Sequence, residues 1–256
     1  MKIATWNVNS IRARNERLLA WMDRERPDVV CLQETKVADD AFPVEDYRAR
    51  GYHVTLLGQR TYNGVAILSI APPVEVRHGL GDEIEDPQAR LVSATCDGVR
   101  VASVYAPNGQ VVGSEKWEYK LRWLDRLRRH LDTLCDPTAP LVLGGDFNVA
   151  PDERDVHDPV LWAKETLFHP DARAALARVT DWGLRDAYRL HHEEAGRYTW
   201  WDYRQLGFPK NRGLRIDHIF LTAPLAERCR SAEIDREMRK GKQPSDHAPM
   251  VVTLDG

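Results

Sequence analysis

Short apolar runs bounded by Gly, Pro, Asn or Asp recur along the whole chain, and this pattern constrains the fold more than any other. Runs of this length are typical of β-strands. They predict strands over residues 2–6, 28–32, 53–57, 65–70, 91–96, 99–105, 141–144, 216–221 and 250–253. The dipeptide Asp97-Gly98 predicts a hairpin turn between two of these strands.

Three segments with apolar residues at helical spacing lie between the strands. The first covers residues 11–26 and stops before Pro27, and the second covers residues 114–134. The third covers residues 171–182. Because sheets need cover on their outer faces, this mixture predicts an α/β fold of layered sheets flanked by helices.

The composition is that of an ordinary soluble globular protein, with 43% hydrophobic and 29% charged residues in 256. We find no linker and no repeat, so residues 1–256 are expected to form a single domain. No run approaches the ~18 apolar residues of a membrane span, and the N-terminus shows no signal peptide. The four cysteines are far apart and form no C-x-x-C pair. This spacing argues against a zinc site and for a reducing, cytoplasmic environment.

The charges are distributed unevenly along the chain, although the net charge is only −3. Residues 204–242 are rich in Lys and Arg, while several acidic residues lie within residues 28–46. The asymmetry has two readings. It can be a solvated face, or it can mark an acidic metal site beside a basic surface that binds phosphate.

Polar side chains stand at the ends of many predicted strands. They are Asn7, Glu34, Tyr105, Asp146, Asn148, Asp217, Asp246 and His247. One such residue would be an ordinary turn former, but the ends of neighbouring strands lie ~5 Å apart, so the whole set can converge. Converged oxygen ligands favour Mg²⁺, Mn²⁺ or Ca²⁺. Alternation along an extended segment predicts that Asp146 and Asn148 share one face, where they can activate and hold a water molecule.

Five motifs resemble those of the exonuclease III family of apurinic/apyrimidinic (AP) endonucleases: "WNVNSIRAR", "PDVVCLQETK", "GDFNVAP", "GLRIDHIF" and "PSDHAP". The resemblance implies a four-layer α-β-β-α sandwich of two packed mixed sheets, with the active site at strand ends on one edge. It also implies a base excision repair nuclease that cleaves duplex DNA 5′ to abasic sites, with 3′-to-5′ exonuclease and 3′-phosphatase or 3′-phosphodiesterase activity. The expected cofactor is Mg²⁺, for which Mn²⁺ substitutes. The expected partner is double-stranded DNA with abasic sites or blocked 3′ ends, bound by a monomer that associates with the nucleoid.

The resemblance assigns roles to individual residues. Glu34 is the main metal ligand, and the other expected ligands are Asn7, Asp146, Asn148, Asp246 and His247. Tyr105 approaches the scissile phosphate and Asp146 is the general base. Asn148 positions the water and a transition-state oxygen. His247 and Asp217 form a pair whose imidazolium binds a phosphoryl oxygen.

The resemblance also predicts DNA contacts. Trp200 and Leu214 line a pocket for the extruded sugar, and the other contacts are Arg90, Lys120, Asn211, Arg212 and Arg215. The segment after Asn148 departs from the family, and His157 and Asp158 are expected to narrow or reshape the lesion site. The balance of endonuclease to exonuclease activity therefore stays open.

Three alternatives remain at this point. A serine-hydrolase triad would use Ser245 with His247, although the chain has no G-x-S-x-G motif. A second alternative is another phosphodiesterase or phosphatase of the superfamily, such as an inositol polyphosphate 5-phosphatase or a sphingomyelinase. The third is a catalytically inactive binding module that retains the fold.

Overall fold

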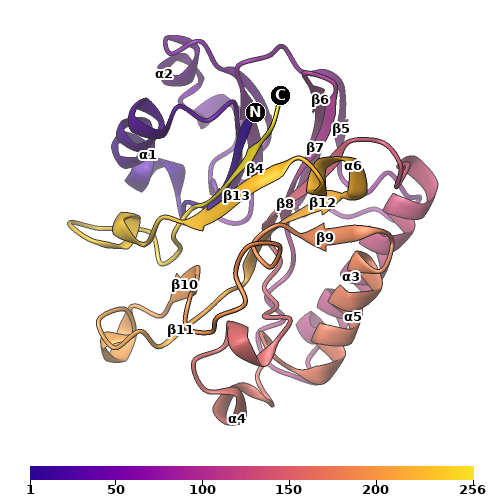
Figure 1. Cartoon of the computed structure of the whole chain (residues 1–256), viewed down its shortest axis with the longest axis vertical. Helices are drawn as coiled ribbons and strands as arrows, with labels where there is room; N and C mark the ends of the chain where they lie inside the picture. Colours follow the sequence, from indigo (N-terminus) through magenta and orange to yellow (C-terminus); the bar gives the residue numbers. More distant parts are fainter.

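Two six-stranded sheets pack face to face, and helices cover their outer sides (Figure 1). The structure is a computed structural model that describes residues 1–256. In order across the first sheet, the strands are β13 (Cys229–Ile234), β14 (Met250–Leu254), β1 (Lys2–Asn7), β2 (Val29–Gln33), β4 (Val65–Ser69) and β3 (His53–Leu57). The strands of the second are β5 (Val74–His78), β6 (Leu91–Cys96), β7 (Val99–Tyr105), β8 (Leu141–Asp146), β12 (Asp217–Thr222) and β9 (Leu184–Asp186).

Helices and a small hairpin complete the fold. The helices are α1 (Ile11–Glu25), α2 (Val44–Arg48), α3 (Glu115–Leu134), α4 (Pro159–Trp162), α5 (Pro170–Thr180) and α6 (Ala223–Ala226). A separate two-stranded sheet joins β10 (Trp200–Trp201) to β11 (Gly213–Leu214). No helix combines the length and the apolar composition that crossing a bilayer requires.

Both large sheets are mixed. The pairs β1–β2 and β7–β8 are parallel, and the other strand pairs are antiparallel. Strand β1 pairs with β14, so the first and last strands of the chain lie side by side, and the two termini lie close together in Figure 1.

Three apolar clusters fill the spaces between the layers. The cluster between the two sheets includes Ile3, Cys31, Val92, Val142 and Ile219, all fully buried. Helices α1 and α2 cover the first sheet, and α3 and α5 cover the second. Each large apolar side chain buried in this way contributes about 1.5–3 kcal/mol to stability. The predicted four-layer α-β-β-α sandwich is confirmed.

The predicted helices and strands agree with the structure to within a few residues. Helix α3 begins after Ser114, whose side chain accepts a hydrogen bond from the Trp117 backbone N–H, as expected for an N-cap. Pattern analysis missed the short strands β9, β10 and β11, the short helices α2, α4 and α6, and the longer edge strands β5 and β13. The sequences of β5 and β13, VEVRH and CRSAEI, lack an apolar run because edge strands are largely exposed.

The second of the two glycines that precede Asp146, Gly145, is required by close strand pairing. A Cβ atom at this position would lie 1.9 Å from the Val104 carbonyl oxygen. Only glycine therefore lets β7 and β8 pair closely here, in the register that sets Tyr105 opposite Asp146.

Candidate active site

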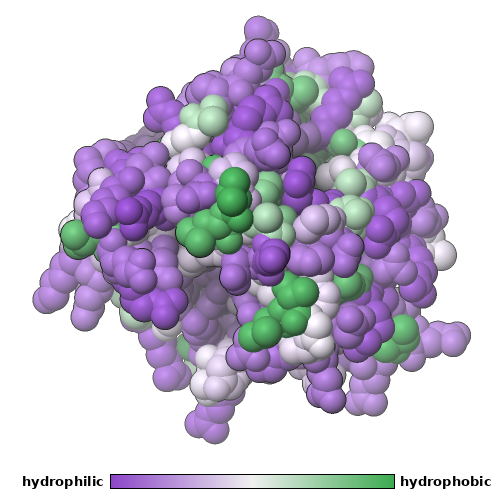
Figure 2. All heavy atoms as spheres, turned by 90° about the horizontal axis from the view of Figure 1, so that it is seen from below, coloured by the Kyte–Doolittle hydropathy of each residue, from purple (hydrophilic) through white to green (hydrophobic).

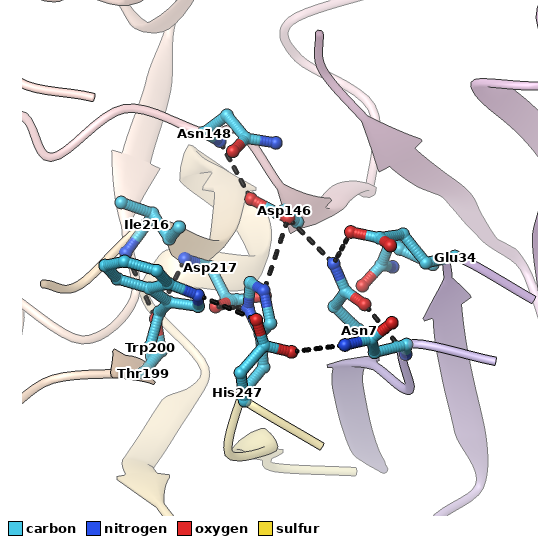
Figure 3. Close-up of polar contacts among 12 residues, drawn as sticks. Asn7, Glu34, Asp146, Asn148, Thr199, Trp200, Ile216, Asp217 and His247 are labelled. Atoms are coloured by element: carbon cyan, nitrogen blue, oxygen red, sulfur yellow. Dashed lines mark hydrogen bonds and ion pairs between the residues drawn. The ribbon is translucent and has the colours of Figure 1, made fainter. Parts of the chain in front are cut away.

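Strand register brings the predicted polar residues together at one edge of the sandwich. Tyr105 at the end of β7 and Asp217 at the start of β12 both pair with Asp146, the last residue of β8. In the facing sheet, Asn7 ends β1, and Glu34 directly follows β2. The side chains from the two sheets point toward one another (Figure 3).

Asn7 links the two sheets through its amide. Its Nδ2 donates to Glu34 Oε1 over 2.8 Å and to Asp146 Oδ2 over 2.9 Å, and Figure 3 shows Asn7 between the two carboxylates. Its Oδ1 accepts the backbone N–H of Asn9. Both amide donors are thus used to hold acids in place.

The predicted geometric relation between Asp146 and Asn148 is wrong. Strand β8 ends at Asp146, and Asn148 has a left-handed backbone with φ of +51°, so the two are not alternate residues of one strand. They meet instead because the Asn148 backbone N–H donates to Asp146 Oδ1 over 2.9 Å. The Asn148 amide then lies between Asn108 Nδ2, from which its Oδ1 accepts, and the Ala106 carbonyl, to which its Nδ2 donates.

His247 and Asp217 form a buried pair. Nδ1 of His247 donates to Asp217 Oδ2 over 2.8 Å, and Nε2 lies 3.8 Å from Asp146 Oδ2. Burial opposes a charged imidazole, but the carboxylates of Asp217 and Asp146 outweigh it and raise the pKa of His247 to about 10. The ring is therefore an imidazolium at neutral pH, and its Nε2–H faces the site.

Asp146 has the properties of a general base. Burial and the charge of Asp217 raise its pKa to about 7, although His247 and the Asn7 hydrogen bond act in the opposite direction. A base works best when its pKa lies near the working pH. Asp146 is also central, since Asn7, Asn148 and His247 all face its two oxygens.

Glu34 is held by three partners. Oε1 accepts from Asn7 and from the Tyr105 hydroxyl at 2.9 Å, and Oε2 lies 2.6 Å from the Lys36 ammonium. Burial would raise the pKa of Glu34, but Lys36 and Asn7 outweigh it and lower the pKa. Burial and Glu34 raise the pKa of Tyr105 well above its usual value, so this side chain remains a phenol.

Glu34, Asp146 and His247 could together hold a metal ion, because one possible ligand atom from each lies within 4.8 Å of the others. Asp246 stands beside this group but outside it, and its two oxygens accept from Asn9 Nδ2 and Trp200 Nε1. Four carboxylates therefore converge here, those of Glu34, Asp146, Asp217 and Asp246, against the cations of Lys36 and His247. A divalent cation would balance the remaining two negative charges, and oxygen donors suit a hard ion.

Ser245 is not an activated nucleophile. Its hydroxyl donates to the Asn7 carbonyl over 2.7 Å and accepts the backbone N–H of His247, while the His247 ring is engaged with Asp217. The serine-hydrolase alternative is therefore wrong.

A cavity of about 470 Å³ opens beside the site, with Trp162, Trp200 and Leu161 as its apolar lining. The Trp162 and Trp200 rings meet edge to face at 6.1 Å. Leu214 packs in the same apolar cluster but is fully buried and does not line the cavity, so the prediction that it does is wrong. Arg204 and Arg212, both exposed, also line the cavity. Viewed from below, on the side of α4, the molecule is mostly hydrophilic with a few separate apolar patches (Figure 2).

The predicted DNA contacts divide into accessible and inaccessible residues. Arg212 is exposed, and Arg90 lies only 9% exposed over the Tyr105 ring, with its guanidinium bonded to Gln88 and to the Tyr105 carbonyl. The Asn211 amide is bonded within the protein on both sides, to Trp201 and to Gly196.

Lys120 and Arg215 are fully buried, so the structure contradicts the expectation that they contact phosphates. Lys120 Nζ donates to three backbone carbonyls, those of Asn108, Asn148 and Thr166, over 2.6–3.1 Å. Burial lowers the pKa of Lys120 to about 7. This side chain joins three loops from within and does not face DNA.

Replacing Lys120 with Met is expected to destabilise the protein by about 2–4 kcal/mol, because three backbone carbonyls lose their donor and two of these contacts are buried. Urea unfolding would measure this loss. Lys116→Met, an exposed position on the same helix, is the control and should change stability by less than about 0.5 kcal/mol. An unchanged stability of Lys120→Met, together with weaker binding to every DNA sequence, would restore the phosphate-contact interpretation.

Sequence reasoning overlooked several residues of the site. Lys36 neutralises Glu34, Asn9 bridges Asn7 and Asp246, and Trp162 completes the cavity wall. Asn9 and Lys36 each stand two positions after an assigned residue, within motifs that had already been noted. Their position next to Asn7 and Glu34 was the sequence signal that could have identified them.

Known proteins resemble this chain along its whole length. Residues 4–247 match the sequence profile of the Endonuclease/Exonuclease/phosphatase family. Exodeoxyribonuclease III of Haemophilus influenzae is 37% identical over 98% of both chains. The structure of an AP endonuclease from Archaeoglobus fulgidus superposes with a TM-score of 0.97 at 41% identity, and covers 100% of both chains. The 3′ phosphatase NExo from Neisseria, bound to a product DNA hairpin, superposes with a TM-score of 0.96 at 39% identity and the same coverage.

Proposed function

Because the chain belongs to the exonuclease III and AP endonuclease family of the endonuclease/exonuclease/phosphatase superfamily, we propose that it cleaves duplex DNA 5′ to abasic sites with a divalent metal ion. It is a DNA repair nuclease of this family, with exonuclease and 3′-phosphatase activities. Its substrate is DNA, and a relative that is 39% identical is bound to a DNA hairpin. The observation that carries the finer proposal is the cluster of Glu34, Asp146 and His247 beside an apolar cavity.

The proposed metal is Mg²⁺, with Glu34 as its main ligand. Asp146 lies close enough to take part, whereas the His247 imidazolium carries a proton on each ring nitrogen and cannot bind the ion. Asn7 holds Glu34 and Asp146 in position. When bound, the ion supplies positive charge to the phosphate and to the departing oxygen.

The protein residues perform the proton chemistry. Asp146 accepts the proton of the attacking water, and the Asn148 backbone N–H fixes the orientation of that carboxylate. The His247 imidazolium, held by Asp217, donates from Nε2 to a phosphoryl oxygen. Tyr105 keeps its proton and holds Glu34 from the side opposite Lys36.

The cavity supplies lesion selectivity in this proposal. Leu161, Trp162 and Trp200 form an apolar wall suited to a sugar that carries no base, and buried Leu214 packs behind it. A baseless nucleotide also costs little to extrude, because it has lost its stacking and pairing partners. Other phosphodiesterases of the superfamily act on substrates without such a sugar, so this wall favours DNA.

The direct test is incubation of a duplex that contains one abasic site with the protein and Mg²⁺. We expect a single nick at the 5′ side of the lesion, which a denaturing gel can map. An intact abasic duplex, with turnover of a phosphoinositide instead, would contradict the proposal.

Replacing Trp200 with Ala is expected to reduce abasic-site cleavage about 10–100-fold more than removal of 3′ nucleotides, because the apolar wall selects the extruded sugar. The two rates are measured on matched duplexes. The control is Trp200→Phe, which keeps an aromatic wall but removes the N–H that Asp246 accepts. It should affect both substrates alike. An equal loss for both substrates in the Ala variant would point to a packing role.

A further inference from the structure

Arg215 is at the centre of a buried ion-pair network that the reaction does not use. Its Nε donates to Asp155 Oδ1 over 2.7 Å, and its Nη2 donates to Asp155 Oδ2 over 3.1 Å. Nη2 also lies 2.8 Å from Asp186 Oδ2. The side chains of Arg215 and Asp155 are both 0% exposed, so neither can reach DNA.

The network carries no net charge. Arg189 also pairs with Asp155, so two arginines face two aspartates. His218 is the fifth member, and burial and Arg215 lower its pKa, which keeps its ring neutral. It accepts from Arg215 Nη1 over 3.0 Å and donates from Nε2 to the Val149 carbonyl over 2.9 Å. A balanced buried cluster is stable only while all its members remain.

The network fixes the segment that runs from β8 to α5, residues 147–169, here called the β8–α5 loop. His218 holds Val149, the residue after Asn148, and Arg215 holds Asp155 through both its side chain and its backbone N–H. Beyond Asp155, Val156 forms a β-bridge with Leu214.

The same loop forms one side of the cavity. The His157 backbone N–H donates to the Gly213 carbonyl over 3.1 Å, and the His157 side chain lines the cavity with Trp162. The part of the loop next to Asp155 is therefore aligned along β11 and forms part of the cavity lining. Its position depends on partners buried beneath it.

We propose that Arg215 and Asp155 form a specificity-determining positioning pair, which sets the β8–α5 loop as a wall of the lesion pocket without touching DNA. The inference rests on the proposed abasic-site cleavage. A loosened wall no longer matches the extruded sugar, whereas Asp146, Asp217 and His247 are held by other bonds.

The test compares two substrates in Asp155→Asn, which keeps the shape of the side chain but removes its charge. We expect abasic-site kcat/KM to fall about 10–100-fold, since a shift of about 1 Å can cost that much, while removal of 3′ nucleotides falls less than about 3-fold. Hydrogen exchange of backbone amides in residues 149–162 should become faster. The matched control is Asp152→Asn, on the same loop, whose side chain is 44% exposed and pairs with Arg154. It should behave like the wild type in both assays.

A second variant decides the matter if Asp155→Asn does not fold. Arg215→Lys keeps the positive charge but lacks the planar fork of N–H groups on two nitrogens that binds both oxygens of Asp155, and it should show the same selective loss. Equal losses on the two substrates, or no loss, in a folded variant would overturn the inference alone. Failure of the wild-type protein to nick abasic DNA would overturn the proposed cleavage as well.

Discussion

Replacing Asp146 with Asn is expected to lower the rate of abasic-site cleavage by about 10²–10⁴-fold, the usual contribution of a general base. This loss corresponds to roughly 3–5 kcal/mol in the activation barrier. The amide has nearly the same shape, so the fold and DNA binding should persist. It cannot accept a proton from water, however, although its amide oxygen can still accept the hydrogen bond from Asn7. Single-turnover rates and DNA affinity should be measured together.

Glu34→Gln separates a base from a metal ligand. This variant weakens the proposed main ligand, so high Mg²⁺ or Mn²⁺ should recover part of its activity, and calorimetry should show weaker Mg²⁺ binding. Asp146→Asn should gain much less from added metal. If high metal restores both variants equally, Asp146 acts chiefly as a ligand and its assignment as the base is wrong.

Removal of divalent metal is expected to abolish cleavage, with a loss of at least about 10³-fold, because metal ions stabilise such transition states by several kcal/mol. Two uncompensated negative charges remain at the site when Lys36 and His247 are counted against the four carboxylates. A phosphodiester adds a further negative charge, and no other side chain bonded within the cluster is a cation. Excess chelator should therefore stop nicking, and added Mg²⁺ should restore it.

The control for this experiment is DNA binding in chelator, measured by fluorescence anisotropy. It separates a defect in the cleavage step from a loss of DNA binding. Calorimetric titration of the metal-free protein with Mg²⁺ provides a readout that does not depend on activity. Robust nicking in excess chelator, with no heat of Mg²⁺ binding, would contradict the proposed metal site.

Much of the fold was predictable because its signals are local. The buried strands β1, β2, β7 and β8 are visible as apolar runs. Ser114 is a typical N-cap residue and Pro27 cannot continue a helix, so both mark helix ends. Asp146, Asp217 and His247 were found because polar residues at either end of an apolar run are visible in sequence. Strands β5 and β13 were not found, because an exposed edge strand has no apolar pattern to read.

The sequence by itself determined which chemical groups the site contains: carboxylates, a carboxamide, an imidazole and a phenol at the ends of strands. Only the tertiary structure decided where the charged side chains point. Lys120 and Arg215 are of the residue types that usually contact phosphates, yet packing buries both. Three backbone carbonyls replace solvent around Lys120, and two aspartates replace it around Arg215. The physical reason is that a long cation is exposed or buried according to partners far away in sequence. Asp155 lies 60 residues from Arg215, and no local pattern records that distance.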